Sequence, residues 1–122
     1  MRWTRNTVAA ALALATLGSC VHYTDSCADT NLSGTTLSGH CGDNKGNNPY
    51  SSLDLSKKVG NNWGVLTWGG VSFQNSCSEI VYNSWNGVLS AKCGNGGGRD
   101  VRTVLNLNNY ISNNWGVLTF DS

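Results

Sequence analysis

Apolar and polar residues alternate in short stretches along this chain, which is typical of β-strands rather than helices. Residues 53–55 and 105–107 each read Leu-polar-Leu, and this period of two predicts two half-buried strands. Asp54, the polar member of the first stretch, is expected to face solvent from its strand. No long helical periodicity is present, and only residues 56–59 and 108–111 are expected to form single helical turns, each capped by its first residue.

The second part of the chain repeats the first at an offset of 52 residues. Residues 61–68, Asn-Asn-Trp-Gly-Val-Leu-Thr-Trp, recur at 113–120 as Asn-Asn-Trp-Gly-Val-Leu-Thr-Phe. Asparagine and glycine tolerate left-handed backbone, so each Asn-Asn-Trp-Gly step predicts a turn between two strands. The aromatic residue that ends each copy closes a strand and is expected in the core. We place the two copies at about 27–76 and 77–122.

Four cysteines follow the same repeat. They are Cys27, Cys41, Cys77 and Cys93, and the segment between the paired cysteines is two residues longer in the second copy. An even set in a small secreted chain indicates a disulfide framework, in which four cysteines allow three pairings. The repeat favours Cys27–Cys41 and Cys77–Cys93, each closing a loop worth roughly 3 kcal/mol. Zinc is a weaker alternative, because CxxC is absent and the two histidines lack paired-ligand spacing.

The start of the chain has the features of a secretory signal peptide. Two arginines precede an apolar stretch at 8–17, and small residues follow it up to Cys20. The apolar stretch is about ten residues, too short to cross a bilayer, so no membrane span is expected. We therefore predict a signal peptide over 1–19, a single domain over 20–122 and a secreted protein. A buried N-terminal helix, and lipidation of Cys20 in a bacterial source, are the alternatives.

Charge and motif content argue against nucleic-acid binding and against catalysis. Without the two arginines of the signal peptide, six lysines and arginines face seven acidic residues, so the basic face that a phosphate backbone requires is missing. The acidic residues are scattered, and no GxSxG motif or EF-hand loop is present. We therefore expect a binding protein that is not an enzyme and needs no metal or other cofactor.

The loops suggest a ligand rich in hydroxyl groups. Asparagine, serine and glycine dominate the predicted loops at 42–48 and 94–98, and they offer donors and acceptors with little charge. Trp63 and Trp115 fall at the tips of the predicted turns, where an indole can present an apolar face to sugar C–H groups. The alternative is that these two side chains fold back over the sheet. Asn31 begins an Asn-Leu-Ser sequon and is a candidate N-glycosylation site.

The cysteine spacing, the repeat period and the Asn-x-x-Gly-x-Leu-x-aromatic motif together resemble the cyanovirin-N family, from about residue 20 to the end. The resemblance implies an elongated all-β fold of two pseudo-symmetric repeats that exchange strands, each half a three-stranded sheet plus a β-hairpin. It also implies metal-free binding of mannose-rich or related oligosaccharides, free or on glycoproteins. Gly69 and Gly70 stand at the hinge where the family's prototype has proline, which favours a monomer over a domain-swapped dimer.

The resemblance assigns up to one sugar site to each half. The first-half set is His22, Asp25, Ser26, Gly42, Asp43, Asn44, Lys45, Asn113, Asn114 and Trp115. The second-half set is Gly60, Asn61, Asn62, Trp63, Ser72, Asn75, Ser76, Gly94, Asn95, Gly96 and Gly98. The second set is rich in glycine where the prototype has charged groups, so the first site is expected to be better preserved. A secreted interaction or structural module that kept the fold and lost sugar binding is the alternative function.

Overall fold

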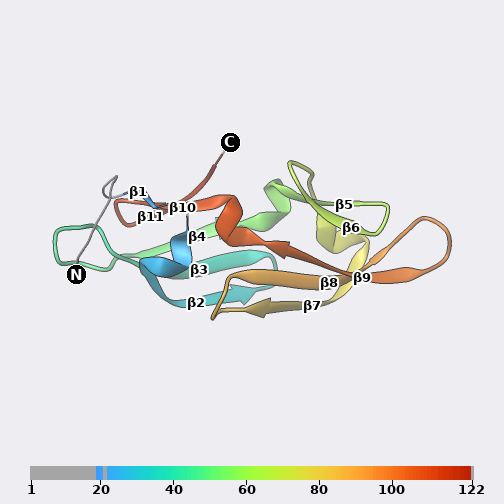
Figure 1. The fold of residues 1–122 in the computed structure, drawn as a ribbon, viewed down its shortest axis with the longest axis horizontal. Helices are drawn as coiled ribbons and strands as arrows, with labels where there is room; N and C mark the ends of the chain where they lie inside the picture. Colours follow the sequence, from blue (N-terminus) through green and yellow to red (C-terminus); the bar gives the residue numbers. More distant parts are fainter. Residues whose placement is uncertain (1–18, 21, 122) are drawn as a thin grey trace.

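The computed structural model describes residues 19–20 and 22–121, which form two halves placed end to end along one long axis (Figure 1). The elements up to the hinge are β1 (Ser19–Cys20), η1 (Tyr23–Asp25), β2 (Cys27–Ser33), β3 (Thr36–Cys41), β4 (Tyr50–Asp54), η2 (Leu55–Lys57), β5 (Val59–Asn62) and β6 (Val65–Trp68). Those after it are η3 (Phe73–Asn75), β7 (Cys77–Asn83), β8 (Val88–Gly94), β9 (Asp100–Asn106), η4 (Leu107–Asn109), β10 (Ile111–Asn114) and β11 (Val117–Phe120). The η elements are single 3₁₀ turns. Apart from residue 19, the expected signal peptide lies outside the described residues, and its boundary stays a prediction.

Each half combines a three-stranded antiparallel sheet from one repeat with a hairpin from the other. The sheet β2-β3-β4 is covered by the hairpin β10-β11, which β1 extends, and the sheet β7-β8-β9 is covered by the hairpin β5-β6. The backbone N–H of Leu118 donates to Ser51 Oγ at 2.9 Å, and that of Leu66 donates to Thr103 Oγ1 at 3.1 Å, so both hairpins are anchored in the same way. The expected all-β fold with exchanged strands is confirmed.

The central strands show why the alternating pattern gives sheets here. In β8, Leu89, Ala91 and Cys93 point into the core while the residues between them are only partly buried. Since side chains alternate between the two faces of a strand, an apolar residue at every second position covers one face only. Disulfides join Cys27 to Cys41 and Cys77 to Cys93, each across a register pair of neighbouring strands, which confirms the pairing favoured by the repeat.

One hydrophobic core runs through both halves, and a hydrogen-bonded chain crosses between them. The hydroxyls of Tyr23 and Tyr82 lie 2.7 Å apart, and the Tyr82 hydroxyl donates to Thr30 Oγ1 at 3.0 Å. Burial, with help from the neighbouring Tyr82, raises the pKa of the Tyr23 phenol, so this buried group stays uncharged. The fully buried members of the core include Leu37, Leu55, Val59, Phe73, Leu89, Leu107 and Ile111.

The structure corrects the expected ends of two strands. Leu55 and Leu107 begin the 3₁₀ turns η2 and η4, so the alternating stretches leave the sheet one residue earlier than predicted. Asp54 is half-buried and caps η2: its Oδ1 accepts hydrogen bonds from Ser56 N, Ser56 Oγ and Thr35 Oγ1 at 2.7–3.0 Å. These bonds, with those from Ser56 first, lower the pKa of Asp54. A capping side chain therefore stops the strand although the apolar period continues.

The hinge between the repeats is packed backbone against backbone. A Cβ added to Gly60 would lie 2.8 Å from Gly70 Cα, so β5 and the chain after β6 touch at two glycines. The aromatic residues that end the two copies, Trp68 and Phe120, are half-buried and pack at the margin of the core with ring centroids 5.5 Å apart. Within residues 19–20 and 22–121, no helix is long and apolar enough to span a membrane.

Candidate functional site

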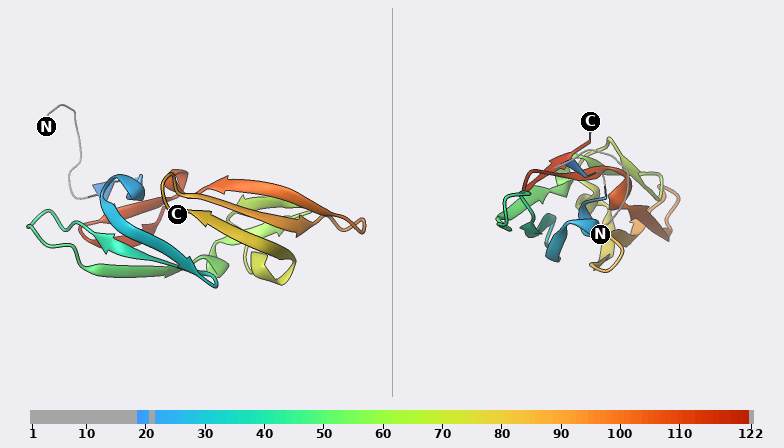
Figure 2. Two further views of the ribbon diagram at one scale, coloured as in Figure 1. Left: turned by 90° about the horizontal axis from the view of Figure 1, so that it is seen from below. Right: turned by 60° about the vertical axis from the view of Figure 1, so that its left-hand side comes forward.

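The two sets of predicted site residues come together at opposite ends of the molecule. In each half the tip of the hairpin lies beside the loop that joins the second and third strands of the sheet, at 42–49 in the first half and 95–99 in the second. Figure 2 shows these two loops projecting at the two ends of the long axis. We call the two places the first and the second junction.

At the first junction, Asn113 joins the hairpin to the sheet. Its Nδ2 donates to Ser26 Oγ at 2.9 Å and to the carbonyl of Gly42 at 3.0 Å, while its Oδ1 accepts from the backbone N–H of Gly116 at 2.8 Å. The side chain is 2% exposed. Asn113 thus lies beside Ser26 and Gly42, which belong to the same predicted set. Its side-chain amide forms hydrogen bonds with these protein groups and so holds the hairpin tip in place.

Asn61 makes the same three contacts at the second junction. Its Nδ2 donates to Ser76 Oγ and to the carbonyl of Gly94, both at 2.9 Å, and its Oδ1 accepts from Gly64 N at 2.7 Å. The two junctions therefore share one frame, in which an asparagine amide fixes the hairpin against the residues that flank the disulfide: one just before its first cysteine and one just after its second.

The loops of the two junctions are also closed in the same way. Oδ1 of Asp43 accepts from the backbone N–H groups of Lys45 and Asn47 at 2.8 and 3.1 Å. Oδ1 of Asn95 accepts from Gly97 N and Arg99 N at 2.8 and 3.3 Å. The hydrogen bond from Lys45 N is the main cause that lowers the pKa of Asp43, so this carboxylate stays ionised at neutral pH. Both side chains act as local backbone caps.

The two loop-tip tryptophans occupy a backbone conformation that is rare for bulky residues. Trp63 and Trp115 have φ of 53° and 54°, and the glycine after each has φ of 96° and 95°. Two consecutive residues with positive φ form the tight turn that matches the twist of a hairpin. A bulky side chain in this region costs about 1–3 kcal/mol, and such strain gathers at functional sites.

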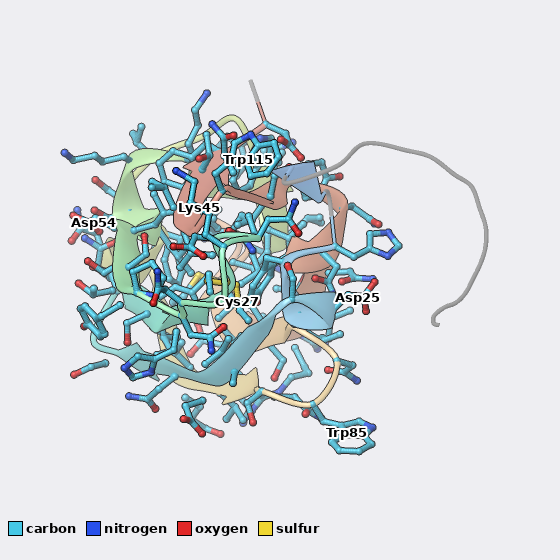
Figure 3. All side chains as sticks on the ribbon, turned by 90° about the vertical axis from the view of Figure 1, so that its left-hand side faces the viewer. Asp25, Cys27, Lys45, Asp54, Trp85 and Trp115 are labelled. Atoms are coloured by element: carbon cyan, nitrogen blue, oxygen red, sulfur yellow. A yellow bond between two sulfur atoms is a disulfide. The ribbon has the colours of Figure 1, made fainter. Side chains whose placement is uncertain are left out.

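Both indoles lie at the surface. The expected loop-tip position is therefore confirmed, and neither indole folds back over the sheet. Trp63 is 76% exposed and Trp115 is 48% exposed. A Cβ added to Gly96 would lie 2.4 Å from Cζ3 of Trp63, which places the indole directly on the glycine. Glycine at this position therefore makes room for the ring. Figure 3 looks onto the first junction, with Trp115 and Lys45 near the viewer and the disulfide of Cys27 behind them.

The two junctions differ in the side chains that their loops carry. Asn44 and Lys45 correspond to Gly96 and Gly97 at the offset of the repeat, and Asn44 and Gly96 share a left-handed backbone, with φ of 67° and 79°. At these two positions the first loop therefore carries an amide and an ammonium group, whereas the second loop carries only backbone; its exposed charged side chain is that of Arg99.

The remaining predicted residues lie around these frames. Asn62 and Asn114 are exposed at the ends of β5 and β10, next to the hairpin tips. Asp25 lies 3.8 Å from the side chain of His22, at the edge of the first junction. Ser72 and Asn75 instead belong to the segment around η3 that follows the hinge. Gly60 is buried against the hinge and lines a pocket of 370 Å³ between it and the β5-β6 hairpin. Gly98 lies in the second loop with no atom within 4 Å of an added Cβ.

A pocket beside the first junction was not expected from the sequence. It has a volume of 520 Å³, and its lining includes Asp25, Ser26, Asp29, His40 and Asn48. His40 is on β3, and its exposed side chain faces this pocket. The available signal was the difference between copies, since positions 29 and 40 hold a pair of residue types that the second repeat does not.

Two further expectations concern single residues and metal ions. Asn31 of the sequon is exposed on β2, and its glycosylation stays a prediction. Among the described residues, no group of three or more histidine, cysteine, aspartate or glutamate side chains is arranged to hold a metal ion.

Comparison with known proteins places this fold in one family. The CVNH domain profile matches residues 23–119. The structure is similar to that of a CVNH protein of Gibberella zeae, at 30% identity and a TM-score of 0.75, over 84% of this chain and 99% of that one. It is also similar to the CVNH protein of T. borchii, at 34% identity and a TM-score of 0.72, over 80% and 97% of the two chains. Microvirin, solved as a mannobiose complex, matches at 25% identity and a TM-score of 0.71, over 81% and 97%. The chain belongs to the CVNH domain family.

Proposed function

We propose that this protein is a secreted lectin that binds mannose-type or related oligosaccharides, without a metal ion, at the two junctions. The observation that carries the proposal is the pair of tryptophans in left-handed backbone at the hairpin tips, found in both copies. An exposed indole with one face resting on the protein offers its other face to the C–H groups of a pyranose. Asparagine and backbone groups beside it supply donors and acceptors for hydroxyls.

Membership in the CVNH family supports carbohydrate binding, as does the mannobiose complex of microvirin. Two disulfides in a chain of this size favour an oxidising, extracellular location. Binding here needs no metal because the junctions present hydrogen-bonding groups and aromatic surface directly to the ligand.

The two sites are unequal in this proposal. At the first junction Asn44 and Lys45 stand beside Trp115, so a sugar meets side-chain donors as well as the indole. At the second junction the sugar meets Trp63 and the backbone of Gly96. We therefore expect the first junction to bind more tightly and to discriminate more sharply between sugars, because oriented polar groups provide specificity.

The test is calorimetric titration of the protein, both disulfides formed, with mannobiose and larger mannose oligomers. Trp115→Ala should weaken binding at the first junction by about tenfold, and Trp63→Ala should remove the weaker second event. Trp85→Ala is the matched control, since Trp85 is 90% exposed on the β7-β8 turn and belongs to neither junction. Chelation with EDTA should leave every affinity unchanged.

Two results would contradict the proposal. Absence of binding to any glycan at millimolar concentration would favour the interaction module that kept the fold and lost sugar binding. Equal losses in Trp85→Ala and Trp115→Ala would show that binding is a general property of exposed indoles and not of the junctions.

A further inference from the structure

We propose that the first half carries an additional sugar subsite on the outer face of the sheet β2-β3-β4. It takes the next pyranose unit of a neutral oligosaccharide whose first units lie at the first junction, so the inference rests on the proposed lectin function. The subsite consists of the pocket that includes Asp29, His40 and Asn48, together with Tyr50 at its rim.

The pocket is continuous with the first junction. Asp25 and Ser26 line it, and Ser26 Oγ is also the acceptor of the hydrogen bond from Asn113 that fixes the hairpin. Its volume of 520 Å³ falls within the range of about 300–1,000 Å³ typical of small-ligand sites. A glycan that extends past Ser26 from the junction would therefore enter the pocket.

The wall of this pocket carries aromatic surface. Ala28, His40 and Tyr50 are register partners across β2, β3 and β4, so their side chains stand in a row on one face of the sheet. The rings of His40 and Tyr50 pack edge to face with centroids 5.7 Å apart, and Tyr50 remains 64% exposed. The exposed Tyr50 ring, inclined by 67° to the ring of His40, presents an aromatic face of the kind that stacks on a pyranose.

Polar groups for the hydroxyls lie next to this surface. Asp29 has φ of 56° at the bulge of β2, and its carboxylate has no hydrogen-bond or ion-pair partner among residues 19–20 and 22–121. A carboxylate accepts from two neighbouring hydroxyls, and the amide of Asn48 both donates and accepts. The pocket thus combines an apolar wall with unoccupied acceptors.

In the second half, ion pairs span the equivalent place. Its bulge residue, Glu79, lies 3.5 Å from Lys92 Nζ and 3.1 Å from an Nη atom of Arg102. Lys92 and Arg102 correspond to His40 and Tyr50 at the repeat offset, and Arg102 also donates to the carbonyl of Glu79 and to Ser90 Oγ, each at 3.2 Å. These charged side chains satisfy one another where the first half leaves an acid and two rings open. The subsite therefore belongs to the first half alone.

The second half also provides the residue types for a variant that tests the subsite. Asp29→Glu, His40→Lys and Tyr50→Arg together give the first half the ion-pair residues of the second. The protein already holds these residues at equivalent positions of a matching sheet, so this closed variant is compatible with the fold. The matched control exchanges the other half, as Glu79→Asp, Lys92→His and Arg102→Tyr. Thermal unfolding confirms that both variants fold.

The probes are mannobiose and a linear mannose tetramer, titrated by calorimetry and followed by NMR of the backbone amides. The unmodified protein should bind the tetramer about tenfold more tightly than the dimer, a gain of roughly 1.4 kcal/mol. The tetramer, but not the dimer, should shift the amides of Ala28, His40 and Asn48. The closed variant should bind both probes with the dimer's affinity, whereas the control variant should keep the tenfold difference.

The outcomes separate this inference from the lectin function. Mannobiose binding with equal affinity for the tetramer, and no shifts on β2 or β3, would overturn the subsite and leave the lectin function standing. An unchanged tetramer affinity in the closed variant would overturn it as well. If neither probe binds, both the lectin function and the subsite are rejected.

Discussion

The side chains of Asn61 and Asn113 each donate two hydrogen bonds and accept one within the protein, although both residues are predicted to bind sugar. These hydrogen bonds hold the tryptophan turn in place beside the loop. At the scale of single residues, the junctions are therefore frames of side-chain hydrogen bonds that carry exposed rings.

Replacing Asn113 by alanine should destabilise the protein by about 1–3 kcal/mol, because Gly116 N–H and the carbonyl of Gly42 lose their partner in a buried place. Urea unfolding measures the loss. Asn114→Ala is the matched control: this neighbour is exposed, and its replacement should change stability by no more than about 0.5 kcal/mol. Equal losses of stability in the two variants would show that the hydrogen bonds of the Asn113 side chain do not stabilise the hairpin tip.

The repeat identified Asn113 and Asn61 in the sequence, and the family resemblance assigned them to the sugar-binding residues. The distinction depends on the carbonyls of Gly42 and Gly94, which are distant in sequence and enter only through the exchanged hairpin. In the same way, the pocket at His40 could not be predicted from the sequence, because it depends on which segments lie beside β3. Residue type and spacing indicate what a side chain can bind, whereas its burial and its hydrogen-bond partners decide whether it binds a ligand or supports the fold.

At the scale of elements, the loops of the two junctions share one conformation with different sequences. Asp43 and Asn95 close them with equivalent hydrogen bonds, and glycines with positive φ complete the turn at Gly46 and Gly98. The alternation of apolar residues predicted the strands, and the Asn-Asn-Trp-Gly motif predicted the turns. The 3₁₀ turns began one residue early, because a capping side chain such as that of Asp54 outweighs the apolar period locally.

Gly96→Ala should displace the Trp63 indole, since the new Cβ would lie 2.4 Å from Cζ3 in the present position. Gly98→Ala is the matched control, because its φ of +86° imposes similar backbone strain with no atom within 4 Å of the new Cβ. Both variants should lose about 1 kcal/mol of stability from positive φ. Only Gly96→Ala should move the indole N–H resonance of Trp63 in NMR spectra and weaken glycan binding at the second junction. A shift of similar size in Gly98→Ala would contradict the proposed contact.

At the scale of the whole molecule, the two halves are joined through one core and a packed hinge. The hydrogen bonds between Tyr23, Tyr82 and Thr30 cross from one half to the other, and Gly60 packs on Gly70 where the chain turns from the first repeat into the second. The family resemblance predicted the exchanged hairpins, and the repeat predicted two similar halves. Neither could predict these contacts, because they depend on how two rigid halves meet.

Gly60→Ala should force the hinge apart, because its Cβ would lie 2.8 Å from Gly70 Cα. Overpacking of this kind costs about 1–3 kcal/mol, and an opened hinge allows the hairpin to pair with a second chain. We expect a monomeric unmodified protein, and a measurable fraction of dimer for Gly60→Ala, by size-exclusion chromatography with light scattering. Gly69→Ala, with φ of +97° and no close atom, should stay monomeric. A monomer for both variants would show that hinge packing does not control the oligomeric state.

Because the hairpins are exchanged, the two structural halves do not coincide with the two sequence repeats. Residues 59–110 contain the hairpin β5-β6, the sheet β7-β8-β9 and the second disulfide as one uninterrupted segment, so the second half is an insertion within the first. An ancestor one repeat long, with its sheet first and its hairpin last, would have completed itself by trading hairpins with an identical chain. Gene duplication and fusion would turn that pair into a single polypeptide and leave the two junctions free to diverge, as positions 44 and 96 have done.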